Sequence, residues 1–247
     1  MKKQTAEWFP EIRGPLRQLL SGFADDYFRK VAQEGIYPED FVKALTEAGW
    51  LSVMIPEEYG GSGLGLAEAS VVMEEINRCG GNAGACHGQM YNMSTLLRHG
   101  SSMQKQRYMP RIASGEWRLQ SMAVTEPTTG TDTTKIKTHA VKKGDRYIVN
   151  GQKVWISRLQ HSELMILLAR TTPLEQVMRK SDGMSIFMVH LDQALGKGME
   201  MRRIENMVNH ETNQVFFDND WTGRQGIQIH PRWPQCRTHA DRSRVYR

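Results

Sequence analysis

The sequence predicts an α+β protein in which an N-terminal α-helical domain precedes an antiparallel, β-barrel-like domain. Two observations support this fold class. Apolar residues recur at helical spacing before Trp117, whereas alternating and β-branched runs separated by glycine turns follow it. Helices first and strands second, with no βαβ alternation, argue against a doubly wound parallel sheet. We therefore expect a helical domain over residues 1–118 and a β-domain over residues 119–219.

The helices of the first half are predicted from apolar spacing and from glycines that end each one. The first is expected to begin with Pro15 in its first turn and to continue to Gly35. Further helices carry apolar residues over 41–45, 66–76 and 90–97, and a short one spans 103–108 and stops near Pro110.

The strands of the second half are predicted from alternating or continuous apolar runs. Gly144-Asp145 predicts a hairpin, and Asn150-Gly151 predicts a second tight turn. The expected strands lie at residues 138–142, 147–149, 153–157, 164–170, 184–190, 199–204 and 214–217.

The charge of the chain is unevenly distributed. Its 247 residues are 39% hydrophobic and 24% charged, as in ordinary globular proteins, and the net charge is +5. Residues 221–247 hold six arginines and one aspartate, so the rest of the chain is neutral. Only this tail favours nucleic-acid binding, and we expect no nucleic-acid partner.

Targeting and metal signals are weak. The longest strongly apolar stretch, residues 164–169, is far shorter than a membrane span, and the N-terminus has no apolar core of a signal peptide. The three cysteines, Cys79, Cys86 and Cys236, cannot form a closed disulfide framework, and their spacing matches no usual zinc pattern. We expect a reduced, cytoplasmic protein without a metal site.

Two segments of the second half carry candidate chemistry. Residues 122–132, MAVTEPTTGTD, run from an apolar strand into a loop of hydroxyls, and residues 151–157, GQKVWIS, place Trp155 and Ser157 on one side of a strand. Each has a simpler interpretation: a polar turn that satisfies its own backbone, and an aromatic residue that packs on a sheet. Composition leaves both interpretations open.

Together these segments resemble the acyl-CoA dehydrogenase family of flavoproteins. That family combines a loop of the form V-T-E-P-x-x-G-S-D with a later Y-x-(I/V)-N-G-x-K-x-(W/F/Y)-I-(T/S), here MAVTEPTTGTD and YIVNGQKVWIS. IPEEYGGSGLG and QKQRYMPRIASGE, both in the first half, are also family-like. The resemblance extends from about residue 10 to residue 219, with the motifs in the family's order.

The resemblance implies FAD as cofactor and an acyl-CoA thioester as substrate. The end of the strand at residues 122–125 would lie along the flavin ring, Trp155 would pack on that ring, and Ser157 would hydrogen-bond near N5. Thr131 replaces the family's usual serine and would meet the substrate. The implied cofactor-binding residues are Met122, Ala123, Val124, Thr125, Gly130, Trp155, Ile156 and Ser157.

The implied reaction is α,β-dehydrogenation, with hydride transfer to the flavin and onward transfer to an electron-transfer flavoprotein. The base is a glutamate that most members carry in a C-terminal helical domain, and residues 220–247 are too few for such a bundle. No residue of this chain is therefore predicted to be the catalytic base. Glu126 is interpreted as a loop acid of the flavin motif, and the chain is expected to be inactive alone. A non-catalytic remnant, a flavin monooxygenase and an acyl-CoA oxidase are the alternatives. Members assemble into homo-oligomers mainly through the domain that this chain lacks.

Two departures from the family pattern remain. Asn209 and His210 stand where many members have an Arg-Ser type sequence, which argues against the standard straight-chain specificity. The acyl chain length cannot be inferred, because helices that follow residue 219 in the family form much of its acyl pocket. The tail, residues 220–247, departs completely from the family, which continues with a stretch like I-G-x-x-G-K-G-F-K-Y-I-L-D-G-L-N. Codons can be chosen for residues 220–236 that encode this kind of peptide in a shifted frame. We expect a frameshift, with a phosphate-binding basic arm as the alternative.

Overall fold

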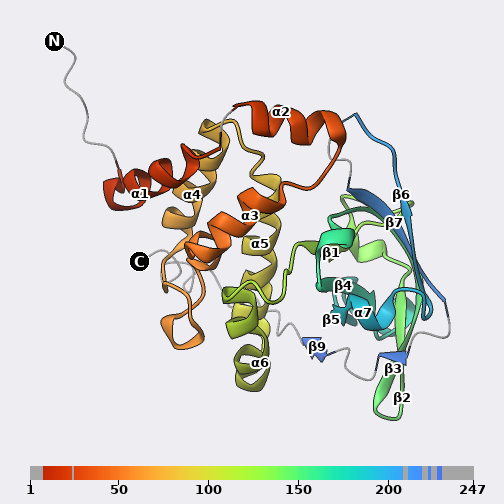
Figure 1. Ribbon diagram of the computed structural model, residues 1–247. Coiled ribbons are helices and arrows are strands. Elements are labelled where there is room, and N and C mark those ends of the chain that lie inside the picture. The colour runs from red at the N-terminus through yellow and green to blue at the C-terminus, as the bar shows by residue number, and fades with distance from the viewer. Residues whose placement is uncertain (1–7, 24, 208–210, 219–221, 224–226, 230–247) are drawn as a thin grey trace.

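The computed structural model describes residues 8–23, 25–207, 211–218, 222–223 and 227–229. A group of helices lies beside a twisted, mostly antiparallel sheet (Figure 1). The last helix of the first half ends at Ala113 and the first strand begins at Ser121, so the predicted order of helices followed by strands is confirmed.

The helical half differs from the prediction at its start. The single helix expected from Pro15 to Gly35 is wrong, because the chain turns after Leu20, where the amide of Phe23 donates to the carbonyl of Leu20 at 3.0 Å. Pro15 lies inside the first helix, and Pro10 occupies its first turn. The helices are α1 (Pro10–Leu20), α2 (Asp25–Glu34), α3 (Glu39–Glu47), α4 (Leu66–Arg78), α5 (Gly84–His99) and α6 (Ser102–Ala113).

Helix α6 also runs further than predicted. It passes through Pro110, although proline removes a backbone hydrogen bond there. A capping box between Ser101 and Gln104 satisfies its first turn, and buried Tyr108 and Ile112 anchor it on both sides of the proline. Packing therefore outweighs the local breaker.

The sheet is mixed, which corrects the expected antiparallel domain. Its main path runs β6-β7-β3-β2-β4-β5-β9, and β4 pairs in parallel with both β1 and β2. The β2–β3 hairpin lies between β1 and β4 in the chain, so β4 can return beside β1 in the same direction. The strands are β1 (Ser121–Ala123), β2 (His139–Lys143), β3 (Arg146–Ser157), β4 (Leu164–Arg170), β5 (Met184–His190), β6 (Met199–Arg203), β7 (Thr212–Phe217), β8 (Thr222–Gly223) and β9 (Ile227–Ile229), with a short helix α7 (Leu191–Ala194) after β5.

The tight turn predicted at Asn150-Gly151 is also wrong, since β3 continues through it. Gly151 has a φ of 147°, and an added Cβ would lie 2.6 Å from the Cα of Thr138. The glycine is required by the close approach of a neighbouring strand, which a dipeptide signal does not distinguish from a turn.

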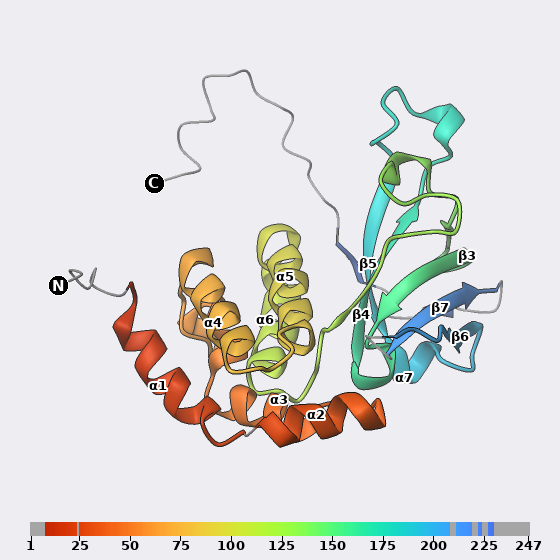
Figure 2. The ribbon, with the colours of Figure 1, turned by 90° about the horizontal axis from the view of Figure 1, so that it is seen from above.

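The helices and the sheet share one of the hydrophobic cores. Tyr108, Met109 and Ile112 of α6 pack with Ile166 of β4 and Met188 of β5, all of them buried. In Figure 2, α5 and α6 lie between α4 and the sheet. Two further cores lie within the helices and within the sheet.

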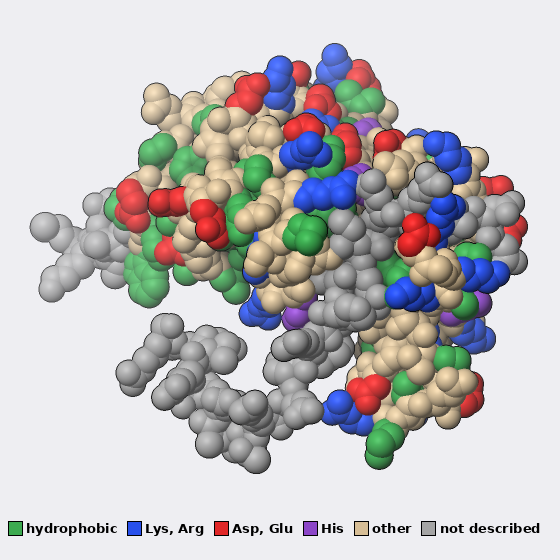
Figure 3. Space-filling view, turned by 90° about the horizontal axis from the view of Figure 1, so that it is seen from below, with side chains coloured by type: hydrophobic (Ala, Val, Ile, Leu, Met, Phe, Trp, Pro, Cys, Tyr) green, Lys and Arg blue, Asp and Glu red, His purple; other side chains and the backbone are tan. Residues whose placement is uncertain are grey.

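Acidic and basic side chains are interspersed on the face shown in Figure 3. In the described part of the chain, no helix is long and apolar enough to cross a membrane, and no group of His, Cys, Asp or Glu is arranged to hold a metal. Cys79 is half-buried, Cys86 is buried, and both are free. The cytoplasmic location stays a prediction. Asn209, His210, Cys236 and most of the tail lie outside the described residues, although β8 and β9 pair with β3 and β5.

Candidate functional site

The two motif segments lie side by side in the sheet domain. The amide of Val154 donates to the carbonyl of Thr125 at 2.9 Å, which joins the end of the first segment to β3. This hydrogen bond brings Trp155 and Ser157 to the residues that follow β1. The fold thus brings together segments that are about thirty residues apart in the sequence.

A β-bulge gives Trp155 its position. The register between β3 and β7 shifts between Lys153 and Ile156, and Trp155 has a φ of 64°. Left-handed backbone at a bulky residue costs about 1–3 kcal/mol and is concentrated at ligand sites. The indole is 59% exposed, whereas Val154 and Ile156 are buried, so the bulge turns this ring outward instead of packing it on the sheet.

The loop after Thr125 is a tight polar turn. Glu126 and Thr129 exchange two backbone hydrogen bonds of 2.9 and 3.0 Å, and Asp132 accepts from the amide of Thr134 at 3.3 Å. This part of the loop satisfies its own backbone, as the simpler interpretation predicts. Gly130 differs, because it is exposed and, its chain neighbours aside, no heavy atom of the described residues lies within 4 Å of where its Cβ would be.

Beneath the loop lies a buried ion pair between Lys153 and Glu126. The ammonium Nζ lies 2.9 Å from the carboxylate Oε1, and the side chains are 0% and 4% exposed. The same carboxylate accepts from the amides of Lys137 at 2.7 Å and Thr138 at 2.9 Å. Burial opposes ionisation of Glu126, but these backbone donors and the ammonium hold its pKa below the usual range. Burial lowers the pKa of Lys153, and Glu126 opposes that shift.

Sequence reasoning missed the role of Lys153. The signal was available, since lysine and glutamate each occupy a fixed place in the two motifs that carry the resemblance. Hydropathy gives no hint of it, because a lysine in a strand normally predicts an exposed position.

The other predicted site residues divide by burial. Ala123 and Ile156 are buried in the core of the sheet, so only their main chain is open to a ligand. Met122, Val124, Thr125 and Ser157 are half-buried, whereas Gly130 and Thr131 are exposed at the tip of the loop.

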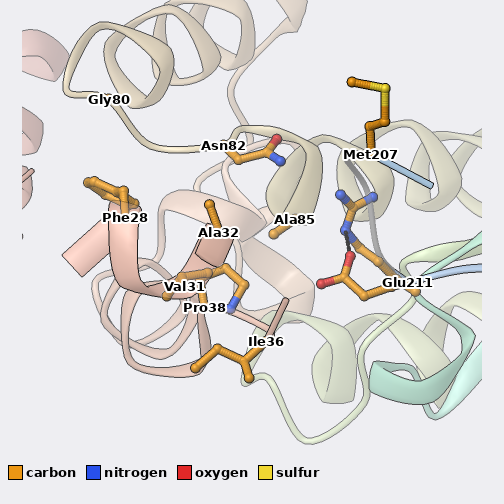
Figure 4. Close-up of a pocket in the computed structure, with 11 residues that line it drawn as sticks. Phe28, Val31, Ala32, Ile36, Pro38, Gly80, Asn82, Ala85, Met207 and Glu211 are labelled. Atoms are coloured by element: carbon orange, nitrogen blue, oxygen red, sulfur yellow. Dashed lines mark ion pairs between the residues drawn. The ribbon is translucent and has the colours of Figure 1, made fainter. Parts of the chain in front are cut away.

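Two cavities lie elsewhere. One, of about 250 Å³, lies beside α2 and contains an ion pair between Arg158 and Glu211 at 3.7 Å (Figure 4). A larger groove, of about 550 Å³, runs over α4 and α5, with Met73 and Met90 among its lining residues. Neither is lined by the predicted cofactor residues, of which Trp155 and Gly130 are exposed.

The exposed surface suits a flat ring with a polar edge. Trp155 offers an uncovered aromatic face, and the Thr125 hydroxyl has no hydrogen-bond partner among the described residues. Gly130 leaves open space at the loop tip. An aromatic platform, a nearby hydroxyl and an uncrowded glycine are features that a flavin nucleotide can use.

Comparisons with known proteins agree with the motifs. A model of the acyl-CoA dehydrogenase N-terminal domain matches residues 10–116, and a model of the middle domain of the same family matches residues 121–219. Together these matches include every helix and strand from α1 to β7.

Individual relatives support the same assignment. The chain is 36% identical to the mitochondrial isovaleryl-CoA dehydrogenase of Bos taurus over 169 residues, which cover 65% of this chain and 39% of the relative. It is 31% identical to the glutaryl-CoA dehydrogenase of Desulfococcus multivorans over 228 residues, which cover 88% and 55%. The chain thus spans about half the length of the curated relatives it matches.

Solved structures share the fold. An acyl-CoA dehydrogenase from Geobacillus kaustophilus superimposes with a TM-score of 0.78 at 28% identity, covering 91% of this chain and 58% of that one. A glutaryl-CoA dehydrogenase in complex with glutaryl-CoA gives a TM-score of 0.77 at 26% identity, covering 91% and 57%. Its motifs, its fold and these matches show that the chain belongs to the acyl-CoA dehydrogenase family of oxidoreductases.

Proposed function

We propose that this chain is the flavin-holding part of an acyl-CoA dehydrogenase, and that it binds FAD along residues 122–125 and 155–157. The observation that supports this proposal most is the outward orientation of the Trp155 side chain. The sheet turns this large aromatic ring outward, at a backbone conformation that costs free energy, one residue after Val154, whose amide donates to the carbonyl of Thr125.

The residues of the chain divide the work of holding the cofactor. Val124 and Thr125 would bind the polar edge of the ring, Trp155 would cover one face, and Ser157 would hydrogen-bond near N5. Gly130 would admit the pyrophosphate, and Thr131 would meet the acyl-CoA. FAD, when bound, supplies the acceptor for the hydride from the β-carbon of the thioester.

We expect that no described residue of this surface acts as the base that removes the α-proton. Glu126 is the acid closest in sequence to the proposed site, and its carboxylate is buried and held by Lys153 and two backbone amides. We therefore expect this chain to bind flavin without oxidising an acyl-CoA. The acyl-CoA substrate and an electron-transfer flavoprotein as acceptor are proposals for the whole protein.

The test is to purify the chain, add FAD, remove the excess and measure the retained flavin by its visible absorbance. We expect about one FAD per chain, quenching of tryptophan fluorescence, and loss of binding in Trp155→Leu. Trp8→Leu is the matched control, because Trp8 is also exposed, at 77%, and lies before α1.

Two results would count against the proposal. Failure of the folded chain to retain FAD would contradict the flavin site, as would equal retention by the wild type and by Trp155→Leu. Bleaching of bound flavin by an added acyl-CoA would instead overturn the claim that the base is absent.

A further inference from the structure

The buried pair of Lys153 and Glu126 joins the two segments that are proposed to hold the flavin. Lys153 is 0% exposed, and its ammonium donates both to Glu126 Oε1 and to the carbonyl of Val124, each at 2.9 Å. A buried charge persists only when it is paired and hydrogen-bonded, and both conditions are met here.

This pair links three separate stretches of chain. Glu126 lies in the first motif segment, Lys153 lies in β3, and the amides of Lys137 and Thr138, in the segment just before β2, bind the carboxylate. Lys153 is also the last residue in register with β7 before the bulge that turns Trp155 outward. The pair therefore fixes the loop and the bulge relative to each other.

Lys153 and the neighbouring amide of Val154 determine where the carbonyls of Val124 and Thr125 point. The carbonyl of Val124 is held by Lys153, and the carbonyl of Thr125 is held by the amide of Val154 at 2.9 Å. Both carbonyls are thus directed towards β3. The Thr125 hydroxyl is left without a partner among the described residues, so it is free to donate to a ligand at this edge, whereas both carbonyls are already engaged by donors of β3.

We infer that Lys153, with Glu126, is a positioning residue for the flavin: it arranges the edge at Val124 and Thr125 before the cofactor arrives and makes that edge favour the electron-rich, reduced ring. This inference rests on the proposed function. Donors aimed at the site where negative charge accumulates stabilise the reduced form, and carbonyl oxygens there would destabilise it.

The test compares the wild type with Lys153→Met, which keeps an unbranched side chain and removes the ammonium. We expect the dissociation constant of FAD to rise by about tenfold or more, a factor that corresponds in free energy to the loss of one good hydrogen bond. We also expect a lower reduction potential of the flavin that remains bound. Without flavin, hydrogen exchange should become faster at residues 122–126.

Glu75→Gln is the control for a loss of stability alone. Glu75 is likewise a buried carboxylate, 1% exposed, paired with Arg13 and Arg17 in the helical half. This variant should destabilise the protein while leaving flavin affinity, potential and exchange at residues 122–126 unchanged. If Lys153→Met does not fold, Glu126→Gln, which preserves side-chain volume, is expected to give smaller changes in the same directions.

Four outcomes would count against the inference or against the proposed function. Wild-type flavin affinity and potential in Lys153→Met would overturn the inference while leaving the flavin site intact, and so would equal losses in Glu75→Gln. Failure of the wild-type chain to bind flavin would overturn the proposed function. Hydrogen exchange of the flavin-free proteins would then still show whether Lys153 orders residues 122–126. Equal exchange rates in the wild type and in Lys153→Met would reject that ordering role as well.

Discussion

The hydroxyl of Tyr108 lies 3.0 Å from Nε2 of His190, and this hydrogen bond joins α6 to the end of β5. Tyr108 is fully buried, and burial raises its pKa to about 12, so the phenol keeps its proton. Trp117 packs edge-on against His190 with ring centroids 5.2 Å apart. A polar contact is therefore built into the core that the helices share with the sheet.

Replacing Tyr108 with Phe removes this hydrogen bond and little volume. We expect the free energy of unfolding to fall by about 1 kcal/mol, the usual net value of a hydrogen bond. Urea denaturation measures it, with Tyr91→Phe as control because Tyr91 is exposed. Equal losses in the two variants would show that the Tyr108 contact adds nothing.

The pH dependence of stability should reflect His190 and His161. Burial lowers the pKa of both from the ordinary 6.5, and His161 also stacks on Tyr37 with centroids 4.3 Å apart. The unfolded chain therefore takes up protons first as the pH falls. The stabilising contribution of the two neutral histidines should be complete above pH 6.5. It should decline as the pH falls from 6.5 towards the lowered pKa values that these histidines have in the folded state.

Melting temperatures recorded between pH 8 and pH 5 test this expectation. His190→Gln should reduce the slope below pH 6.5, whereas His139→Gln, at an exposed position of β2, should leave it unchanged. A slope that is the same in all three proteins would assign the pH dependence to other groups.

Glu75 should be the most costly charge to remove from the helical half. Its carboxylate accepts from Arg17 at 2.6 and 2.8 Å and from Arg13, and these arginines hold its pKa below 4.5. Glu75→Gln leaves the largely buried Arg13 with a neutral partner there, so we expect a loss of about 3 kcal/mol. The difference from the wild type should shrink as the pH falls through the lowered pKa, and an undiminished difference at acidic pH would contradict it.

The parts of the fold that sequence reasoning predicted are those that local patterns determine. The strands at residues 164–170 and 184–190 match β4 and β5 to the residue, because these runs are apolar and buried on both faces. The break between α1 and α2 and the passage of α6 through Pro110 were missed. Both depend on tertiary packing, which outweighs local signals.

The candidate site shows the same division. Resemblance pointed to Trp155 and Thr125, but no pattern in the sequence predicts that a bulge would turn the indole outward. Lys153 was missed for the opposite reason, since a buried lysine contradicts every hydropathy rule until its partner Glu126 is seen.

Gly151 gives a sharp test of the close approach between β3 and Thr138. Gly151→Ala would place a methyl group 2.6 Å from the Cα of Thr138, at a φ of 147°. Gly144→Ala is the matched control, because Gly144 also has a positive φ, 62°, but no heavy atom of the described residues outside its chain neighbours lies within 4 Å of its Cβ position. We expect about 1 kcal/mol of destabilisation for the control, from its left-handed backbone, and clearly more for Gly151→Ala. Equal unfolding free energies would show that the contact with Thr138 is easily relieved.

The tail leads to a prediction about the gene. We propose that residues 220–247 are read in a shifted frame, because their codons can be chosen so that reading one base later yields I-G-R-D-G-K-G-F-K-Y-I-L-D-G-L-N-A-E-R. This peptide resembles the stretch that follows the corresponding strand in the family. It would replace an arginine-rich tail that holds the whole positive charge excess of an otherwise neutral chain. Sequencing the gene decides the question. A shifted frame that encodes some other peptide would contradict the proposal and favour a basic arm. Nucleic-acid binding by such an arm should vanish when residues 221–247 are deleted.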